Sequence, residues 1–127
     1  MEKALEATKY DLEERLIEFC LLVIEIVELL PENKVGNHIG GQLLRSGSSP
    51  AFNYGEAQSA ESRSDFIHKM RICLKELRES RIALKIIMRK PLLNQSEKVE
   101  RALKECNELI AIFVKSISTA EKNRKAK

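Results

Sequence analysis

Residues 45–66 read RSGSSPAFNYGEAQSAESRSDF, and this stretch decides whether the chain forms one domain or two. Its serines, glycines and proline resemble a flexible linker. A connection without secondary structure would, however, far exceed the usual loop length of roughly 4–6 residues in a compact domain. Residues that lie alternately four and three positions apart instead mark one face of a helix over residues 38–60. That face consists of Ile39, Leu43, Ser46, Pro50, Asn53, Ala57 and Ala60.

Pro50 is the residue that argues against this helix. A proline inside a helix removes one backbone hydrogen bond and costs about 3 kcal/mol. The hydroxyls of Ser46 and Ser49 can engage the freed backbone groups, and small residues let a neighbouring helix approach closely. We therefore expect a kinked helix, and the alternative is a break into two shorter helices.

Three longer amphipathic helices are expected around it, over residues 11–30, 64–88 and 96–122. Pro31 and Pro91 end the first two, and Ser62 or Ser64 and then Ser96 can cap the starts of the later ones. Four helices with short links bury their apolar faces best as an all-α, antiparallel up-down four-helix bundle in a single domain spanning residues 1–127. The inward-facing stripes of these three helices are Leu12, Leu16, Phe19, Val23, Ile26 and Leu30; Phe66, Met70, Cys73, Leu77, Leu84 and Ile87; and Val99, Ala102, Cys106, Leu109, Phe113 and Ser116.

The composition is that of a folded, helix-rich protein. The 127 residues are 43% apolar and 32% charged, with three prolines and five glycines, too few turn residues for a β-sandwich or barrel. Cys20, Cys73 and Cys106 form no CxxC pair and lie among apolar residues, as structural thiols do in a reducing cytosol. The N-terminus lacks the apolar core of a signal peptide, and the longest apolar run is too short to span a bilayer. We expect a cytoplasmic protein that does not enter the membrane.

Charge is unevenly distributed along the chain, although the net formal charge is only +3. Residues 1–36 hold four Lys/Arg and nine Asp/Glu, a net −5, whereas residues 62–90 hold nine and three, a net +6. A row of cations with helical spacing, interrupted only by Ile82, could neutralise nucleic-acid phosphates. No aromatic residue flanks this row, so base-specific readout is not expected. We name the row the basic ridge, and it consists of Arg71, Lys75, Arg78, Lys85 and Arg89.

Two other interpretations of the basic ridge stay open. The cations could form an ordinary solvated face, or they could pair with the acidic first helix. The acidic residues available for such pairing are Glu14, Glu18, Glu25 and Glu28.

A second polar set lies in the two middle helices, which should pack antiparallel across a short turn. A buried carboxylate without a partner is costly, so partners should exist, and Arg45 could reach Glu76 or Glu79. We expect a hydrogen-bonded network that fixes helix register or a subunit contact. Acid–base catalysis would need a nucleophile and a substrate handle that the sequence does not offer, so no enzymatic activity is expected. The set is Arg45, Asn53, Glu56, Glu76 and Glu79.

Metal and cofactor motifs are absent from the sequence. A di-metal carboxylate bundle needs Glu-x-x-His on two helices, and neither His38 nor His68 follows a glutamate by three. Zinc-type Cys/His spacing, a Walker motif and a nucleophile elbow are missing too. No metal and no cofactor are expected.

Two runs carry a family resemblance: GQLLRSGSSPAFNYGEA at residues 41–57 and SRSDFIHKMRICLKELRESRIALKII at residues 62–87. Together they resemble the four-helix-bundle proteins encoded by intervening sequences within bacterial 23S ribosomal RNA genes. The sequence departs from the family pattern at Ala57, where glycine is frequent, and at Ile82 and Ala83, which replace an aromatic pair. The matching residues are Gln42, Leu43, Arg45, Ser46, Asn53, Glu56, Ala57, Ser64, Asp65, Phe66, Glu76, Leu77 and Glu79.

This resemblance implies an antiparallel four-helix bundle that assembles as a homopentamer. It also implies a distant relation to the accessory variability protein of diversity-generating retroelements, whose pentameric barrel binds reverse transcriptase and template RNA. A pentamer would repeat the basic ridge five times. The first function hypothesis is therefore a non-enzymatic, oligomeric module that binds RNA or DNA phosphates as a ribonucleoprotein accessory. The alternative is a protein–protein interaction scaffold that binds no nucleic acid.

Overall fold

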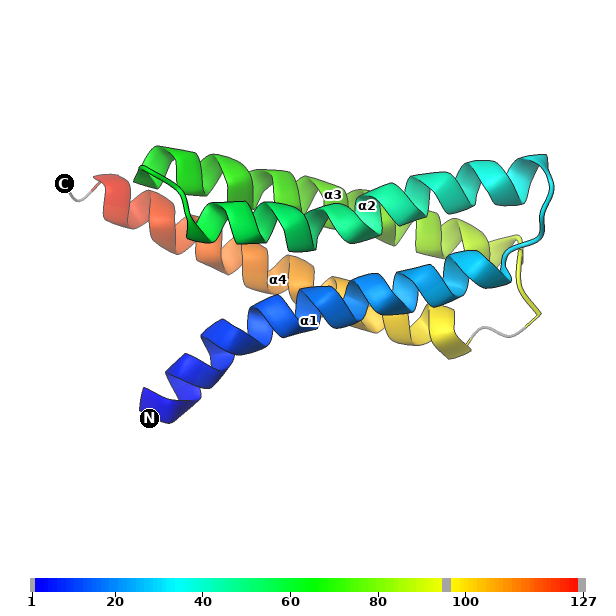
Figure 1. Ribbon diagram of the computed structural model, residues 1–127, viewed down its shortest axis with the longest axis horizontal. Coiled ribbons are helices and arrows are strands. Elements are labelled where there is room, and N and C mark those ends of the chain that lie inside the picture. The colour runs from blue at the N-terminus through cyan, green and yellow to red at the C-terminus, as the bar shows by residue number, and fades with distance from the viewer. Residues whose placement is uncertain (1, 95–96, 126–127) are drawn as a thin grey trace.

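The computed structural model describes the backbone of residues 2–94 and 97–125, with side chains from residue 12 onward. Four helices follow in order: α1 (Glu2–Leu29), α2 (Lys34–Gln58), α3 (Arg63–Arg89) and α4 (Glu97–Lys125). Successive helices run antiparallel, and α1 diverges from the others toward its N-terminus (Figure 1). The all-α, up-down four-helix bundle expected from the sequence is confirmed.

The helices pack on one another around a square. α2 packs on α1 and on α3, and α4 packs on α3 and on α1. α1 and α3 therefore occupy one diagonal, and their backbones do not approach each other closely anywhere in the described part of the chain. None of the described helices has the length and apolarity needed to cross a membrane.

The core is built from the predicted stripes, with one exchange on α2. Leu43, Ser46, Pro50 and Ala57 are buried as expected, but Tyr54 rather than Asn53 points inward between them. The Tyr54 ring meets Phe113 of α4 edge to face, with ring centroids 6.0 Å apart and planes at 78°. This aromatic contact joins the diagonal pair α2 and α4.

The helix ends differ from the expected ranges where capping decides them. α2 begins at Lys34 rather than at residue 38, because Asn33 Oδ1 accepts a hydrogen bond from the Gly36 backbone N–H at 2.8 Å. Gly36 allows this close turn, since a Cβ there would collide with the Pro31 carbonyl. Ser62 caps α3 by accepting from the Asp65 N–H at 3.0 Å. The expected cap at Ser96 lies outside the described residues.

α1 and α4 are longer than expected, and α1 ends one residue earlier. α1 begins at Glu2 instead of residue 11, and α4 continues to Lys125 instead of residue 122. In both cases the extension lies beyond the apolar stripe that predicted the helix. In α4 the added residues 123–125 are polar and exposed.

α2 runs through Pro50 without a break. Ser48, rather than Ser49, donates its hydroxyl to a backbone carbonyl, that of Leu44 at 2.7 Å, while Ser49 accepts from Asn53. The small residues also act as expected, because Gly47 lies against α1. A Cβ on Gly47 would stand 2.7 Å from Val23 Cγ1, closer than real contacts allow.

The two buried cysteines have structural surroundings. Cys73 and Cys106 donate to the carbonyls of Pro50 and Leu77, at 3.5 and 3.1 Å. Burial raises the pKa of each thiol to about 12, so both stay protonated at neutral pH. They pack as small apolar side chains between helices.

Candidate nucleic-acid interface and polar network

The basic ridge lies on the outward side of α3. Arg71, Lys75, Arg78 and Arg89 are exposed and Lys85 is half-buried. Its orientation follows from the opposite face of the helix, where Met70, Cys73, Leu77, Ser80, Leu84 and Ile87 are buried.

Only one ridge cation has an ion-pair partner among the described residues. Arg71 Nη2 stands 3.4 Å from Glu121 Oε1 of α4, and Arg124 contacts the same carboxylate at 3.0 Å. No described carboxylate lies within ion-pair distance of Lys75, Arg78, Lys85 or Arg89.

Pairing of the ridge with the acidic first helix does not occur within the chain. α1 and α3 lie on a diagonal, so Glu14, Glu18 and Glu28 cannot reach the ridge. Glu25 pairs instead with Lys98 of α4 at 3.4 Å. Of the alternatives considered from the sequence, intrachain pairing with α1 is therefore wrong.

Apolar side chains interrupt the ridge and border a groove beside it. Ile82 is 55% exposed and Ile86 is 43% exposed. The groove between α2 and α3, about 250 Å³ in volume, is lined by Ile39, Gln42, Ser46, Glu79, Ile82, Ala83 and Ile86. A second hollow of about 400 Å³ is lined by Ile82, Lys85, Ile86, Arg89 and Lys90. The α2–α3 face is thus apolar at its centre and cationic at one border.

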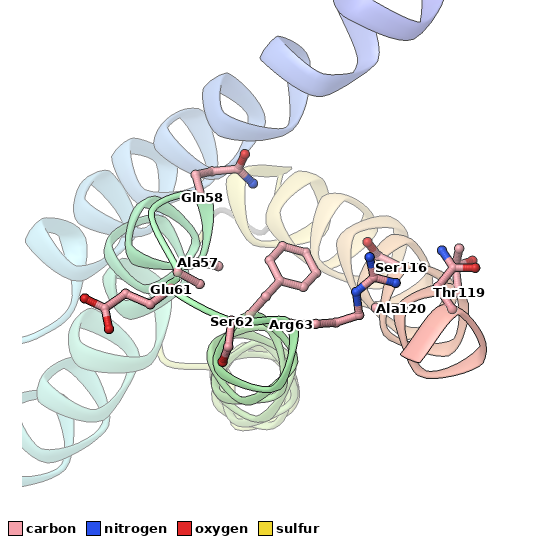
Figure 2. Close-up of a pocket in the computed structure, with 11 residues that line it drawn as sticks. Ala57, Gln58, Glu61, Ser62, Arg63, Ser116, Thr119 and Ala120 are labelled. Atoms are coloured by element: carbon pink, nitrogen blue, oxygen red, sulfur yellow. The ribbon is translucent and has the colours of Figure 1, made fainter. Parts of the chain in front are cut away.

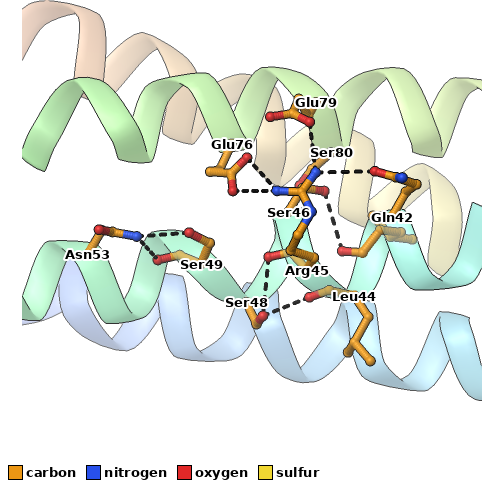
Figure 3. A network of polar contacts seen from close by, with 11 residues as sticks. Gln42, Leu44, Arg45, Ser46, Ser48, Ser49, Asn53, Glu76, Glu79 and Ser80 are labelled. Atoms are coloured by element: carbon orange, nitrogen blue, oxygen red, sulfur yellow. Dashed lines mark hydrogen bonds and ion pairs between the residues drawn. The ribbon is translucent and has the colours of Figure 1, made fainter.

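Arg45 organises the polar network between α2 and α3 (Figure 3). Its Nη1 donates to both oxygens of Glu76, at 3.0 and 2.7 Å, and its Nη2 donates to Glu79 at 2.9 Å. Gln42 adds an acceptor at 3.2 Å, which sequence reasoning missed. Close to this cluster, the buried hydroxyl of Ser80 donates to that of Ser46 at 2.9 Å. These hydrogen bonds connect α2 to α3.

The pKa values of the two carboxyl groups in the network are shifted in opposite directions. Burial raises the pKa of Glu76, which is only 8% exposed, and the hydrogen bond with Glu79 raises it further, against the effect of Arg45. The hydrogen bond with Glu76 and the one from Arg45 lower the pKa of Glu79. Glu76 therefore takes up a proton at a higher pH than Glu79 does.

The expected five-residue set is divided into three parts. Asn53 donates within its own helix, to the Ser49 carbonyl at 3.0 Å and the Ser49 hydroxyl at 2.8 Å. Glu56 pairs with Lys69 at 2.9 Å, near the turn between the helices. The antiparallel arrangement places Glu56 opposite the start of α3, more than one turn from Glu76. Inclusion of Asn53 and Glu56 in the Arg45 network was therefore wrong.

A cavity at the end of the bundle was not anticipated from the sequence (Figure 2). It measures about 690 Å³ and lies where the α2–α3 turn faces the last turns of α4. Small side chains at core positions leave it hollow, and these offered the signal that could have found it: Ala57, Ala60, Ser116 and Ala120. The remaining lining residues are Gln58, Glu61, Ser62, Arg63, Phe66, Thr119 and Asn123.

Comparison with known proteins identifies the family. The model of the 23S rRNA-intervening sequence protein family matches residues 8–115, most of the chain. The chain belongs to this family. A search of curated proteins gave no match.

A solved relative agrees with this assignment to the 23S rRNA-intervening sequence proteins. It is the crystal structure of a protein with unknown function from the S23 ribosomal protein family of Bacteroides thetaiotaomicron VPI-5482. The match has 28% sequence identity and a TM-score of 0.76, and it covers 84% of this chain and 97% of the other. The resemblance inferred from the two sequence runs is confirmed.

The family motifs of this intervening sequence protein now have structural explanations. Arg45, Glu76 and Glu79 meet in the network, and Gln42 supports the guanidinium. The Asn53 and Glu56 pair of motif residues contributes outside the Arg45 network. Asn53 donates to the Ser49 carbonyl within α2, and Glu56 forms an ion pair with Lys69 of α3 near the turn.

Proposed function

We propose that this protein is a non-enzymatic, homo-oligomeric, cytoplasmic module that binds the phosphate backbone of RNA or DNA through the basic ridge, as a ribonucleoprotein accessory. The observation that carries the proposal is the lack of described carboxylate partners for Lys75, Arg78, Lys85 and Arg89. Cations that are neither paired nor fully buried are available to phosphates, and counterion release from the nucleic acid then favours binding.

The dimensions of the ridge suit an extended polyanion. Arg71 and Arg89 are 18 positions apart on one helix, which corresponds to about 27 Å along its axis. Binding through point charges without stacking aromatics implies little sequence preference. We expect similar affinities for RNA and DNA of unrelated sequence.

Exposed apolar side chains support the homo-oligomeric part of the proposal, and the family resemblance implies a homopentamer. Phe52 is 73% exposed on α2, and further large apolar groups are exposed on all four helices. Clustered exposed apolar groups mark association surfaces in soluble proteins. The other exposed groups on these helices include Ile17, Leu21, Leu44, Ile82 and Ile86.

The ridge is tested by binding to structured RNA and duplex DNA across a salt series, followed by fluorescence anisotropy. Wild-type affinity should fall steeply with salt, and the double variant Lys75→Glu, Arg78→Glu should flatten the slope of log Kd against log salt by about 2. A matched variant, Lys104→Glu with Lys115→Glu, reverses two exposed α4 cations and should bind like wild type. Absence of binding by wild type even at low salt would refute the nucleic-acid proposal.

One observation favours the alternative, a protein–protein interaction scaffold. The groove lined by Ile39, Ile82 and Ile86 is apolar, and phosphates gain nothing from such a surface. Protein partners would bind there with affinities that depend weakly on salt. If this second function holds, the substitution Ile86→Asp would weaken the binding of protein partners and leave the affinity for RNA unchanged.

A further inference from the structure

The outer side of α1 carries an apolar stripe with an acidic border. Ile17 and Leu21 are exposed and Ile24 is half-buried, and their spacing of four and three aligns them along the helix. Exposed glutamates follow one side of this stripe and, at Glu28, lie in line with it: Glu14, Glu18, Glu25 and Glu28. Of these, only Glu25 pairs with a described cation, Lys98. We name this surface the acidic stripe.

The α2–α3 groove has the complementary character. Ile39, Ile82 and Ile86 give it an apolar centre, and Lys85 and Arg89 border the adjoining hollow. Neither cation has an ion-pair partner among the described residues. Glu79 also lines the groove, and its carboxylate is paired with Arg45. An amphipathic helix with apolar residues at its centre and carboxylates along one edge would match this surface in both polarity and charge.

These two surfaces cannot meet within one chain. The acidic stripe belongs to α1 and the groove to α2 and α3, and the described parts of α1 and α3 do not pack on each other. Two copies of the chain can bring them together. Because the stripe and the groove are different surfaces, each copy would use both, which is a head-to-tail contact that closes into a ring or continues as a filament.

We propose that the α2–α3 groove of one copy binds the acidic stripe of α1 from a second copy. Ile17 and Leu21 would enter the apolar groove, and Glu18 and Glu28 would pair with Lys85 and Arg89. The inference rests on the homo-oligomer in the proposed function and adds the surfaces that form its interface. It also divides the basic ridge: assembly covers Lys85 and Arg89 and leaves Lys75 and Arg78 for phosphate.

The experiment uses complementary charge reversal in the full chain. One variant carries Glu18→Lys and Glu28→Lys, and the other carries Lys85→Glu and Arg89→Glu. In either variant alone, like charges meet at every contact, so the association constant measured by analytical ultracentrifugation should fall about tenfold or more. An equimolar mixture should recover association through contacts between unlike chains. The reversed stripe of the first variant then meets the reversed groove of the second, and the unchanged stripe of the second meets the unchanged groove of the first. Both contacts join opposite charges. The exposed-site variant Lys104→Glu with Lys115→Glu should assemble like wild type.

The outcomes separate this inference from the proposed function. If both reversed chains assemble as well as wild type, or if the folded variants stay apart on mixing, the stripe-to-groove contact is wrong while the homo-oligomer stands. A wild-type chain that is monomeric at every concentration overturns both the contact and the homo-oligomer. Nucleic-acid binding is assessed with the Glu18→Lys, Glu28→Lys variant, which leaves every cation of the basic ridge intact. Circular dichroism melting of each variant confirms that the reversed chains are folded.

Discussion

At the residue scale, the feature that most constrains this protein is one guanidinium shared by two carboxyl groups. Arg45 bonds both Glu76 and Glu79, and Glu76 is nearly buried whereas Glu79 is partly exposed. A buried carboxylate is destabilised by lost hydration, so Glu76 takes up a proton at a higher pH than Glu79 does.

The network predicts a pH dependence whose sign follows from the two pKa shifts. Glu76 has a pKa above its ordinary 4.5, so the folded state binds more protons and stability falls as pH rises above 4.5. Glu79 has a lowered pKa, and its contribution is lost as pH falls below 4.5. The variant Glu76→Gln imitates the protonated form, so its unfolding free energy relative to wild type should rise between pH 5 and 7.

Urea unfolding at successive pH values measures this difference. Glu56→Gln is the matched control, since Glu56 is exposed and forms an ion pair outside the network. It should show no comparable rise with pH. A constant difference between Glu76→Gln and wild type from pH 5 to 7 would contradict the raised pKa of Glu76.

Two glycines in α2 predict opposite responses to the same substitution. Gly47→Ala should destabilise the fold by about 1–3 kcal/mol, because the new methyl group meets Val23 at 2.7 Å. Gly41 has open space around its Cβ position, so Gly41→Ala should stabilise by about 0.5–1 kcal/mol through helix propensity alone. Chemical unfolding of both variants gives the comparison, and equal signs would refute the close approach of α1 and α2.

At the element scale, α2 is the helix whose composition most opposes its conformation. It contains Pro50 and five glycines, yet it is continuous from Lys34 to Gln58. Burial against α1 and α3 stabilises it where propensity does not. Hydrogen bonds from Ser48 and Asn53 to backbone carbonyls add local support.

The first turn of α2 depends on its cap. Removing the side-chain acceptor in Asn33→Ala should lower the free energy of unfolding by about 0.5–2 kcal/mol, because the Gly36 N–H loses its partner. Asn33→Asp keeps an acceptor oxygen and should lie close to wild type. Thermal melting of the pair tests the cap, and equal losses in both variants would show that it contributes nothing.

At the scale of the whole molecule, the arrangement of the helices separates charge. The acidic stripe of α1 and the basic ridge of α3 lie on diagonal helices, so their charges do not neutralise each other within a chain. Such a molecule attracts partners of either sign at different faces. The proposed phosphate binding and the proposed self-assembly both use this separation.

Salt should therefore weaken self-assembly. Raising the salt concentration from about 0.1 to 1 M shortens the screening length from about 10 to 3 Å, and contacts between exposed charges lose most of their attraction. The sedimentation mass at fixed protein concentration should decrease across this range. A mass that stays constant or grows would mean that apolar burial, rather than charge pairing, holds the copies together.

The sequence alone determined the helices, their order and the family, because an apolar period of 3.6 is a local property of the chain. Even the helix through Pro50 followed from its spacing and from loop length. The pairing of Arg45 with Glu76 and Glu79 was also within reach, since adjacent antiparallel helices leave few registers open.

Only the tertiary structure decided which surfaces face one another. The inward position of Tyr54 instead of Asn53, the separate ion pair of Glu56, and the hollow between Ala57 and Ser116 depend on how the helices are rotated and how closely they approach. The diagonal of α1 and α3, which keeps the basic ridge from pairing with the acidic first helix, depends on packing order around the square. Local spacing specifies which residues share one helix face, whereas contacts between faces arise from the packing of all four helices together.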